Sequence, residues 1–130
     1  MSNTRKPLRG NAYREGYLRS PAWFARRDRW FRDELLRTGR LECVACSAEA
    51  TMRMLELHHV DYSGVNRADA VWRARELHTD LMALHPYCHE LLHRLIDRDR
   101  VLARHRDRRA ASMSALLRLR GKLRGHREAS

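Results

Sequence analysis

The sequence has little cysteine, and the few cysteines do not suggest disulfides. The 130 residues include three cysteines, and the N-terminal residues form no apolar signal segment. A small secreted domain would be expected to carry an even set of cysteines at regular spacing. We therefore expect a protein of the reducing cytoplasm, in which the cysteines bind a metal.

Long hydrophobic runs are also missing. No apolar stretch approaches the roughly 20 residues that a helix needs to span a bilayer, so we expect no membrane association. A chain of 130 residues suggests one small domain, which buries proportionately less of its surface than a large one. A bound metal would supply some of the cross-linking that such a small core lacks.

Acidic residues are scarce at both ends of the chain. Residues 1–40 have 11 basic and 4 acidic side chains, residues 41–97 have 5 and 9, and residues 98–130 have 11 and 3. These counts divide the chain into a basic N-terminal arm and helix, a central core, and a basic C-terminal helix or tail. We expect the flanks to bind a polyanion and the core to bind cations.

Nearly all of the positive charge is arginine, whose planar fork suits phosphate. The alternative is a solvated surface with no partner. The arginines taken as candidate ligands of the DNA backbone are Arg26, Arg27, Arg118 and Arg120.

The first regular element predicted is a helix from Pro21 to about Thr38. Ser20 is a suitable N-cap, Pro21 fits the first helical position, and Gly39 ends the helix. Its aromatic and leucine pairs recur at about two-turn spacing and indicate a core-facing stripe. The preceding residues 10–19 are expected to be irregular.

Further elements follow from periodicity and turn residues. Residues 41–44 are predicted to form a strand that pairs as an antiparallel hairpin with residues 55–60. Residues 61–80 are interpreted as a loop, with room for one or two helical turns at 68–76. Helices are expected from about Pro86 to Asp97 and around residues 110–119, where Met113, Leu116 and Leu117 form a stripe, and disorder is expected beyond Gly121.

Two short motifs of equal spacing suggest a structural zinc site. Cys43-x-x-Cys46 follows the first predicted strand, and His85-x-x-Cys88 begins a predicted helix. Three sulfurs and one imidazole are a common tetrahedral zinc set. Such an ion can contribute on the order of 10 kcal/mol of folding free energy. The alternative is a set of free buried cysteines.

Histidines cluster around the same elements. His89 and His93 lie four residues apart on one helix face and can bind one ion together. His58 and His59 are neighbours in a predicted strand, so their side chains point to opposite faces. Each of these two can therefore have its own role.

In order and spacing, these motifs resemble the HNH endonuclease family, in particular its zinc-stapled phage- and prophage-type members. The resemblance covers about residues 41–97. It rests on Cys43-x-x-Cys46, on Leu57-His-His-Val60 followed by Tyr62 and Gly64, and on Asp80-Leu-x-x-Leu-His-x-x-Cys-His-x-x-x-His93. It implies a small α+β fold with a ββα-metal core, a short hairpin plus a helix, stapled by zinc and flanked by an N-terminal helix and a basic C-terminal helix or tail.

The resemblance also implies roles for single residues. His59 would be the general base that takes a proton from water, for which an imidazole with a pKa of about 6.5 is suited. A catalytic divalent cation (Mn²⁺, Ni²⁺, Co²⁺, Zn²⁺ or Mg²⁺) would be bound by His58, His89 and His93. Asp80 stands where the family usually has an asparagine that braces the loop carrying the base, with Asn66 as a poorer match. His85 replaces the usual cysteine, and His78 is expected to be a surface residue.

The predicted function is a metal-dependent DNA endonuclease with largely sequence-independent backbone contacts. The family further implies phage DNA-packaging proteins as partners. The alternative is a zinc-stapled DNA-binding module with weak or no nuclease activity.

Overall fold

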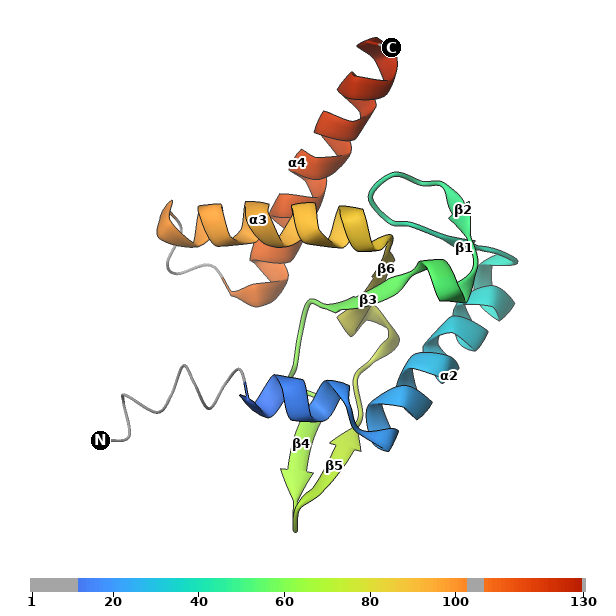
Figure 1. Ribbon diagram of the computed structural model, residues 1–130, viewed down its shortest axis with the longest axis vertical. Coiled ribbons are helices and arrows are strands. Elements are labelled where there is room, and N and C mark those ends of the chain that lie inside the picture. Colours follow the sequence, from blue (N-terminus) through green and yellow to red (C-terminus); the bar gives the residue numbers. More distant parts are fainter. Residues whose placement is uncertain (1–11, 103–106, 130) are drawn as a thin grey trace.

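The computed structural model describes residues 12–102 and 107–129, which form an α+β fold (Figure 1). The coarse fold class predicted from the sequence is thus confirmed. Within these residues a short helix over 12–18 precedes the main elements. These are α2 (Pro21–Thr38), β1 (Leu41–Glu42), β2 (Glu49–Ala50), β3 (Glu56–His59), β4 (Val65–Ala68), β5 (Val71–Ala74), β6 (Leu81–Leu84), α3 (Pro86–Leu102) and α4 (Arg108–Ala129), with 3-10 turns at Met52–Met54 and His78–Asp80.

Helix α2 has the predicted bounds and caps. The Ser20 side chain accepts a hydrogen bond from the Trp23 backbone N–H, and Gly39 ends the helix in the left-handed conformation at φ 85°. The helix buries Trp23, Trp30 and Phe31. The predicted stripe stops there, because the leucines of the last turn are exposed.

The expectation of an irregular segment before α2 is wrong, since residues 12–18 are helical. Tyr13 and Tyr17, one helical turn apart, pack with ring centroids 4.5 and 5.5 Å from that of Trp72. Trp72 lies on β5, so a distant strand provides the apolar surface against which this helix forms.

The predicted pairing of the first two strands is also wrong. β1 pairs with β2 across the cysteine turn, whereas β3 pairs antiparallel with β6, with His58 opposite Met82 and His59 opposite Leu81. The cysteine turn is tight, since the Cys43 N–H bonds the Ala48 carbonyl at 3.0 Å. β1 therefore meets its partner within a few residues, and β3 pairs edge to edge with the wholly buried β6.

Within residues 61–80, where a loop or helical turns were predicted, residues 65–74 form a β-hairpin. β4 and β5 pair antiparallel around Asp69 and Ala70, which have φ values of 52° and 63°. Positive φ at both central residues matches the twist of a two-residue hairpin, but alanine there is not a recognisable turn signal. At the base of the hairpin, a Cβ on Gly64 would lie 2.5 Å from the Arg75 backbone, so only glycine fits.

Helices α3 and α4 both extend beyond their predicted ranges and pack against each other, with α4 crossing α3 in Figure 1. α4 continues to Ala129, so the predicted disorder after Gly121 is wrong. Its buried stripe also differs from the predicted one, since Met113 and Leu117 are exposed. The buried residues of α4 are Ser112, Ala115, Leu116 and Leu119.

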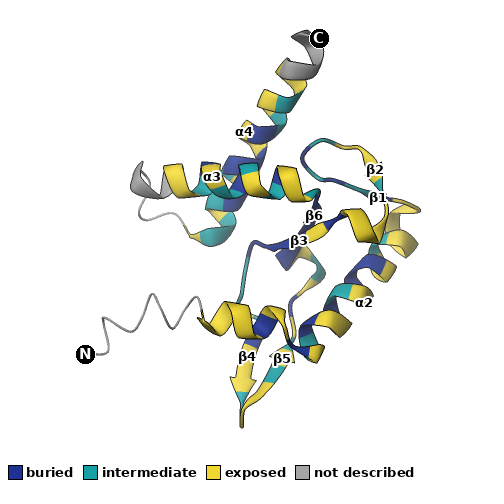
Figure 2. Ribbon diagram, viewed as in Figure 1, coloured by how far each residue is buried: buried dark blue, intermediate teal, exposed yellow. Residues whose placement is uncertain are grey.

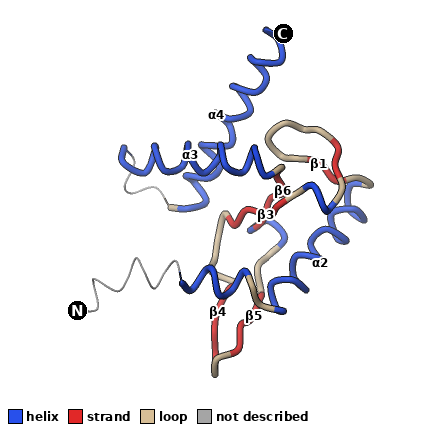
Figure 3. The backbone as a smooth tube through the Cα atoms, viewed as in Figure 1, coloured by secondary structure: helices blue, strands red, loops and turns tan. Residues whose placement is uncertain are grey.

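The core lies between α2, the β3–β6 pair and the facing sides of α3 and α4, where Figure 2 shows the buried positions. The strands are short, and loops, tan in Figure 3, make up much of the chain between them. None of the helices in the described part of the chain is long and apolar enough to cross a membrane.

Candidate metal centres

The two predicted cysteine-containing motifs meet in one cluster. The ligand atoms of Cys43, Cys46, His85 and Cys88 all lie within 4.8 Å of one another. The Cys46 sulfur is 3.4 Å from His85 Nδ1, and the His85 N–H donates to the Cys43 sulfur at 3.5 Å. No disulfide joins the cysteines. Three sulfurs and one imidazole at this separation could hold a structural metal such as zinc.

The electrostatics of the thiols also fit a cation. Burial and the neighbouring thiols raise the pKa of Cys88 to about 12. Burial also opposes ionisation of Cys43, but hydrogen bonds from backbone N–H groups outweigh it and hold the Cys43 pKa below its usual value. Three thiols gathered this closely ionise together only when a cation offsets their mutual repulsion.

Hydrogen bonds to the backbone of Val44 connect this cluster to the rest of the protein. The Val44 N–H donates to the Ala83 carbonyl on β6 at 2.8 Å. From α4, Arg120 Nε donates to the Val44 carbonyl at 2.9 Å. Arg120, predicted to contact DNA, therefore also fastens α4 to the cysteine turn.

A second cluster consists of the three histidines predicted to bind the catalytic ion. His58 Nδ1 is 3.2 Å from His89 Nε2, which is 3.0 Å from His93 Nε2. His58 comes from β3, and the other two lie on one face of α3. Three imidazoles with all ligand atoms within 4.8 Å would leave coordination positions of a metal open.

Hydrogen bonds orient two of these rings. The outer nitrogen of His58, Nε2, lies 2.9 Å from the Ser112 hydroxyl. His89 Nδ1 lies 2.9 Å from a Glu56 carboxylate oxygen. Such partners select the nitrogen that faces a metal.

Burial and nearby positive groups lower the pKa of His58 to about 2, and burial also lowers the pKa of His93. Both rings are therefore neutral near pH 7, as metal ligands must be.

His59 points to the other side of β3, as the strand geometry predicts. Its Nε2 lies 2.7 Å from a carboxylate oxygen of Glu76, which also accepts a hydrogen bond from the Tyr17 hydroxyl at 2.6 Å. The His59 ring is 2 % exposed and stacks on Tyr62 at a centroid distance of 4.2 Å. Burial lowers the pKa of His59, while the hydrogen bond to Glu76 opposes that shift.

Glu76 was not predicted as a functional residue, because it falls in a region interpreted as loop and has no motif around it. Burial alone would raise its pKa, but hydrogen bonds from His59 and Tyr17 hold the pKa below its usual value. Glu76 is therefore an ionised carboxylate that orients the His59 ring.

Asp80 lies outside both clusters and braces the segment before β6. Its carboxylate accepts the Leu77 N–H at 2.8 Å and pairs with Arg109, and its carbonyl accepts the Val60 N–H at 2.8 Å. The bond to Val60 joins this segment to the residue after His59. Asn66, the poorer match for this position, lies on the exposed face of β4.

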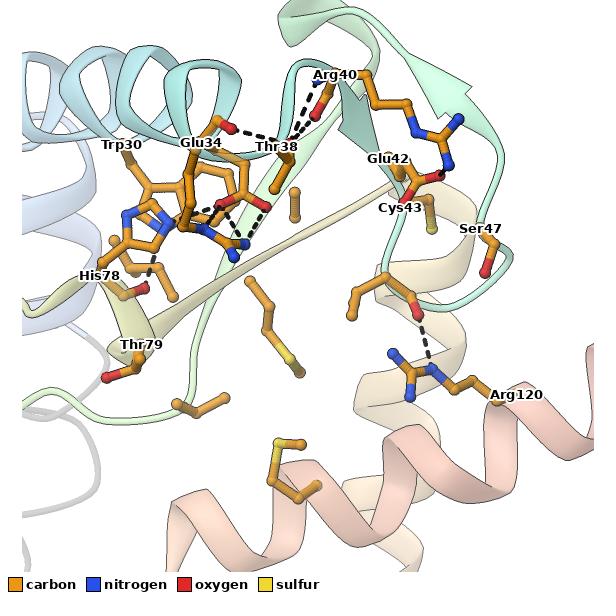
Figure 4. Close-up of a pocket in the computed structure, with 17 residues that line it drawn as sticks. Trp30, Glu34, Thr38, Arg40, Glu42, Cys43, Ser47, His78, Thr79 and Arg120 are labelled. Carbon is orange, nitrogen blue, oxygen red and sulfur yellow. Dashed lines mark hydrogen bonds and ion pairs between the residues drawn. The ribbon is translucent and has the colours of Figure 1, made fainter.

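His78 is placed as a packing residue, away from the three-histidine cluster. Its ring stacks on Trp30 at 4.7 Å, and its Nε2 lies 2.8 Å from Glu34. His78, Trp30 and Glu34 line a cavity between α2, the cysteine turn and α4 (Figure 4). Figure 4 also shows Arg120 reaching the cysteine turn. Since His58, His89 and His93 do not line this cavity, it is separate from the candidate catalytic centre.

The arginines predicted to bind phosphate differ in placement. Arg26 is 4 % exposed, and its Nε donates to the Glu76 carbonyl at 3.0 Å. The prediction that Arg26 contacts DNA is therefore wrong, because the chain around Glu76 packs over this face of α2. Arg27 is partly exposed beside Asp28, and Arg118 is exposed on α4.

Two other arginines lie close to the candidate centre and were not singled out from the sequence. The guanidinium carbons of Arg14 and Arg108 lie 4.8 and 4.9 Å from the centroid of the Tyr62 ring. Arg108 Nε also donates to the His59 carbonyl at 2.7 Å. No sequence pattern distinguishes Arg14 and Arg108 from the many other arginines of the basic flanks.

Comparison with protein-family models, with curated proteins and with solved structures finds no match to this chain. The resemblance to the HNH family stays a prediction carried by the motifs. The function is therefore inferred from the chemistry of the two clusters and of the His59–Glu76 pair.

Proposed function

We propose that the protein is a metal-dependent endonuclease of the HNH type that hydrolyses DNA phosphodiester bonds, with β3, β6 and α3 as a ββα-metal core. One observation carries the proposal. Adjacent residues of β3 place His58 in a three-histidine cluster and His59 against a buried carboxylate. A metal site and an oriented base on the two faces of one short strand are the parts that phosphodiester hydrolysis requires.

The three histidines are the residues that would hold the catalytic ion. A bound divalent cation would polarise the phosphate and stabilise the leaving oxygen. Imidazole ligands favour manganese, cobalt, nickel or zinc over magnesium, which prefers oxygen ligands. The neutral state of His58 and His93 at pH 7 means that protons compete little for the site.

His59 acts as the general base in this proposal. Because Glu76 is ionised, His59 donates its Nε2–H to the carboxylate and keeps the lone pair on Nδ1 to accept a proton from water. The carboxylate then stabilises the imidazolium that forms. Since the ring is 2 % exposed and packs against Tyr62 and Trp23, neighbouring side chains must move for water to reach it.

DNA would bind through its phosphates. Arg14 and Arg108 lie next to the candidate centre, and exposed arginines such as Arg118 extend the positive surface along α4. Arginine contacts to phosphate give affinity without sequence preference. The family resemblance further implies phage DNA-packaging proteins as partners.

The burial of His59 favours a second candidate, a zinc-stapled DNA-binding module with weak or no nuclease activity. A plasmid-nicking assay across divalent metals separates the two functions. His59→Gln is the sharper variant, because His59→Ala would also leave a cavity among buried aromatic rings. We expect the wild type to nick DNA and His59→Gln to lose about 10²- to 10⁴-fold in rate. Equal rates, with a mock purification excluding contaminating nuclease, would reject His59 as the base, and no nicking with any metal would support the binding module.

A further inference from the structure

Helix α4 lies outside the segment that resembles the HNH family, yet its first two turns contact the proposed base His59, the proposed metal ligand His58 and the bracing residue Asp80. Arg108 donates to the His59 carbonyl, Arg109 pairs with Asp80, and Ser112 bonds the His58 ring. Arg108 and Ser112 are four residues apart and so share a helix face. That face makes hydrogen-bond contacts with two successive residues of β3.

Ser112 is the contact with the clearest consequence. Its side chain is 0 % exposed, and its hydroxyl oxygen lies 2.9 Å from His58 Nε2. The opposite ring nitrogen, Nδ1, faces the cluster, 3.2 Å from His89 Nε2. A half-turn of the His58 ring would place carbon atoms at both positions, so this hydrogen bond selects one ring orientation.

We propose that Ser112 is a positioning residue of the three-histidine centre, whose hydroxyl holds the His58 ring with Nδ1 toward the metal. The proposal rests on the metal site of the proposed function. When Nδ1 ligates a cation, the neutral ring carries its proton on Nε2, and that N–H is buried with Ser112 as its acceptor. The serine therefore favours both the ring orientation and the tautomer that bind metal.

The hydroxyl matters because it is the one hydrogen-bond partner that the described residues give His58 Nε2. The neighbouring buried residues of α4 are apolar, namely Ala115, Leu116 and Leu119. Without the hydroxyl, the metal-bound form of His58 would hold an unpaired N–H away from water. Loss of such a partner of a ligating histidine typically weakens metal binding by about 10- to 100-fold.

The test is a calorimetric titration of Ni²⁺ into protein whose cysteine cluster is already loaded with zinc. Ser112→Ala should bind Ni²⁺ about 10- to 100-fold more weakly than the wild type, and Ser112→Thr, which keeps a hydroxyl, should recover most of the affinity. Ser114→Ala, two residues along the same helix, is the matched control and should leave the affinity unchanged. Thermal unfolding and zinc content check that each variant is folded.

A second measurement needs neither Ni²⁺ nor a variant. ¹⁵N NMR of the zinc-loaded wild type without Ni²⁺ should show His58 as the Nε2–H tautomer, and Nδ1–H would overturn the proposal. Wild-type affinity in Ser112→Ala would also overturn it while leaving the metal site intact. If the wild type and His58→Ala both failed to bind Ni²⁺, the metal centre of the proposed function would fail together with this role for Ser112.

Discussion

The two clusters share a helix but differ in how many coordination positions they fill. The cysteine cluster offers four ligand atoms, three of them sulfur, and two of its members are buried. The histidine cluster offers three imidazoles. Four protein ligands complete a tetrahedral metal, whereas three leave room for water or substrate. The first cluster thus suits a structural metal, and the open positions of the second are what the proposed catalytic ion would need.

The clusters are also joined through consecutive residues. Cys88 belongs to one and His89 to the other, both in the first turn of α3. A metal bound at the cysteines would fix the start of α3 against the β1–β2 turn. It would thereby also fix the distance from His89 to His58 on β3. A metal at the first cluster would thus act on the second through the backbone, and the reverse dependence should be weak.

The largest effect is expected from breaking the cysteine cluster. Cys46→Ser should lose zinc and unfold or aggregate, because a structural zinc contributes on the order of 10 kcal/mol of folding free energy. His85→Cys should retain the metal, because zinc accepts either ligand. Metal analysis and thermal unfolding measure both outcomes. Full stability and unchanged zinc content in Cys46→Ser would rule out a structural metal at the cysteine cluster.

Breaking the histidine cluster should leave the fold intact. His93→Ala is expected to keep its zinc and its unfolding temperature while losing cleavage through weaker binding of the catalytic ion. Excess metal should restore part of the activity of His93→Ala and none of that of His59→Gln. Nicking rates over a series of metal concentrations test this difference. Equal rescue of both variants would contradict the separate roles of the two faces of β3.

A smaller effect is expected at the carboxylate behind His59. Glu76→Gln keeps the size of the side chain but loses the charge that stabilises the His59 imidazolium, so the cleavage rate should fall by roughly 10-fold, less than the loss of the base itself. Ni²⁺ affinity at the histidine cluster should not change, since Glu76 contacts His59 and not the ligands. A matching drop in metal affinity would show that the two faces of β3 are not independent.

The smallest effect is expected on the basic flanks. Arg118→Ala should weaken binding to unrelated duplexes alike and reduce the salt dependence of affinity by about one unit of slope. Both clusters should keep their metals. Arg26→Ala is the contrasting variant and should lower stability, because Arg26 is buried against the Glu76 backbone. An unchanged salt slope in Arg118→Ala would exclude this arginine from the DNA contact.

The amino-acid sequence by itself determined the features that depend on near neighbours. Ser20, Pro21 and Gly39 predicted the bounds of α2, and two three-residue spacings predicted the cysteine cluster. The four-residue spacing of His89 and His93 placed them on one face of α3. Helix periodicity and capping act over a few residues, so these patterns can be identified locally.

Tertiary structure alone decided which distant segments meet. β3 pairs with β6, whereas the strand before the cysteine turn pairs with β2 across that turn. Glu76 reaches His59 across 17 residues, and Ser112 reaches His58 across 54. A glutamate and a serine carry no local signal of such contacts, since their partners are chosen by how α4 and the β4–β5 hairpin pack. Spacing therefore predicted the candidate ligands on α3 and at the cysteine turn, and the family resemblance added His58, whereas neither predicted the residues that orient them.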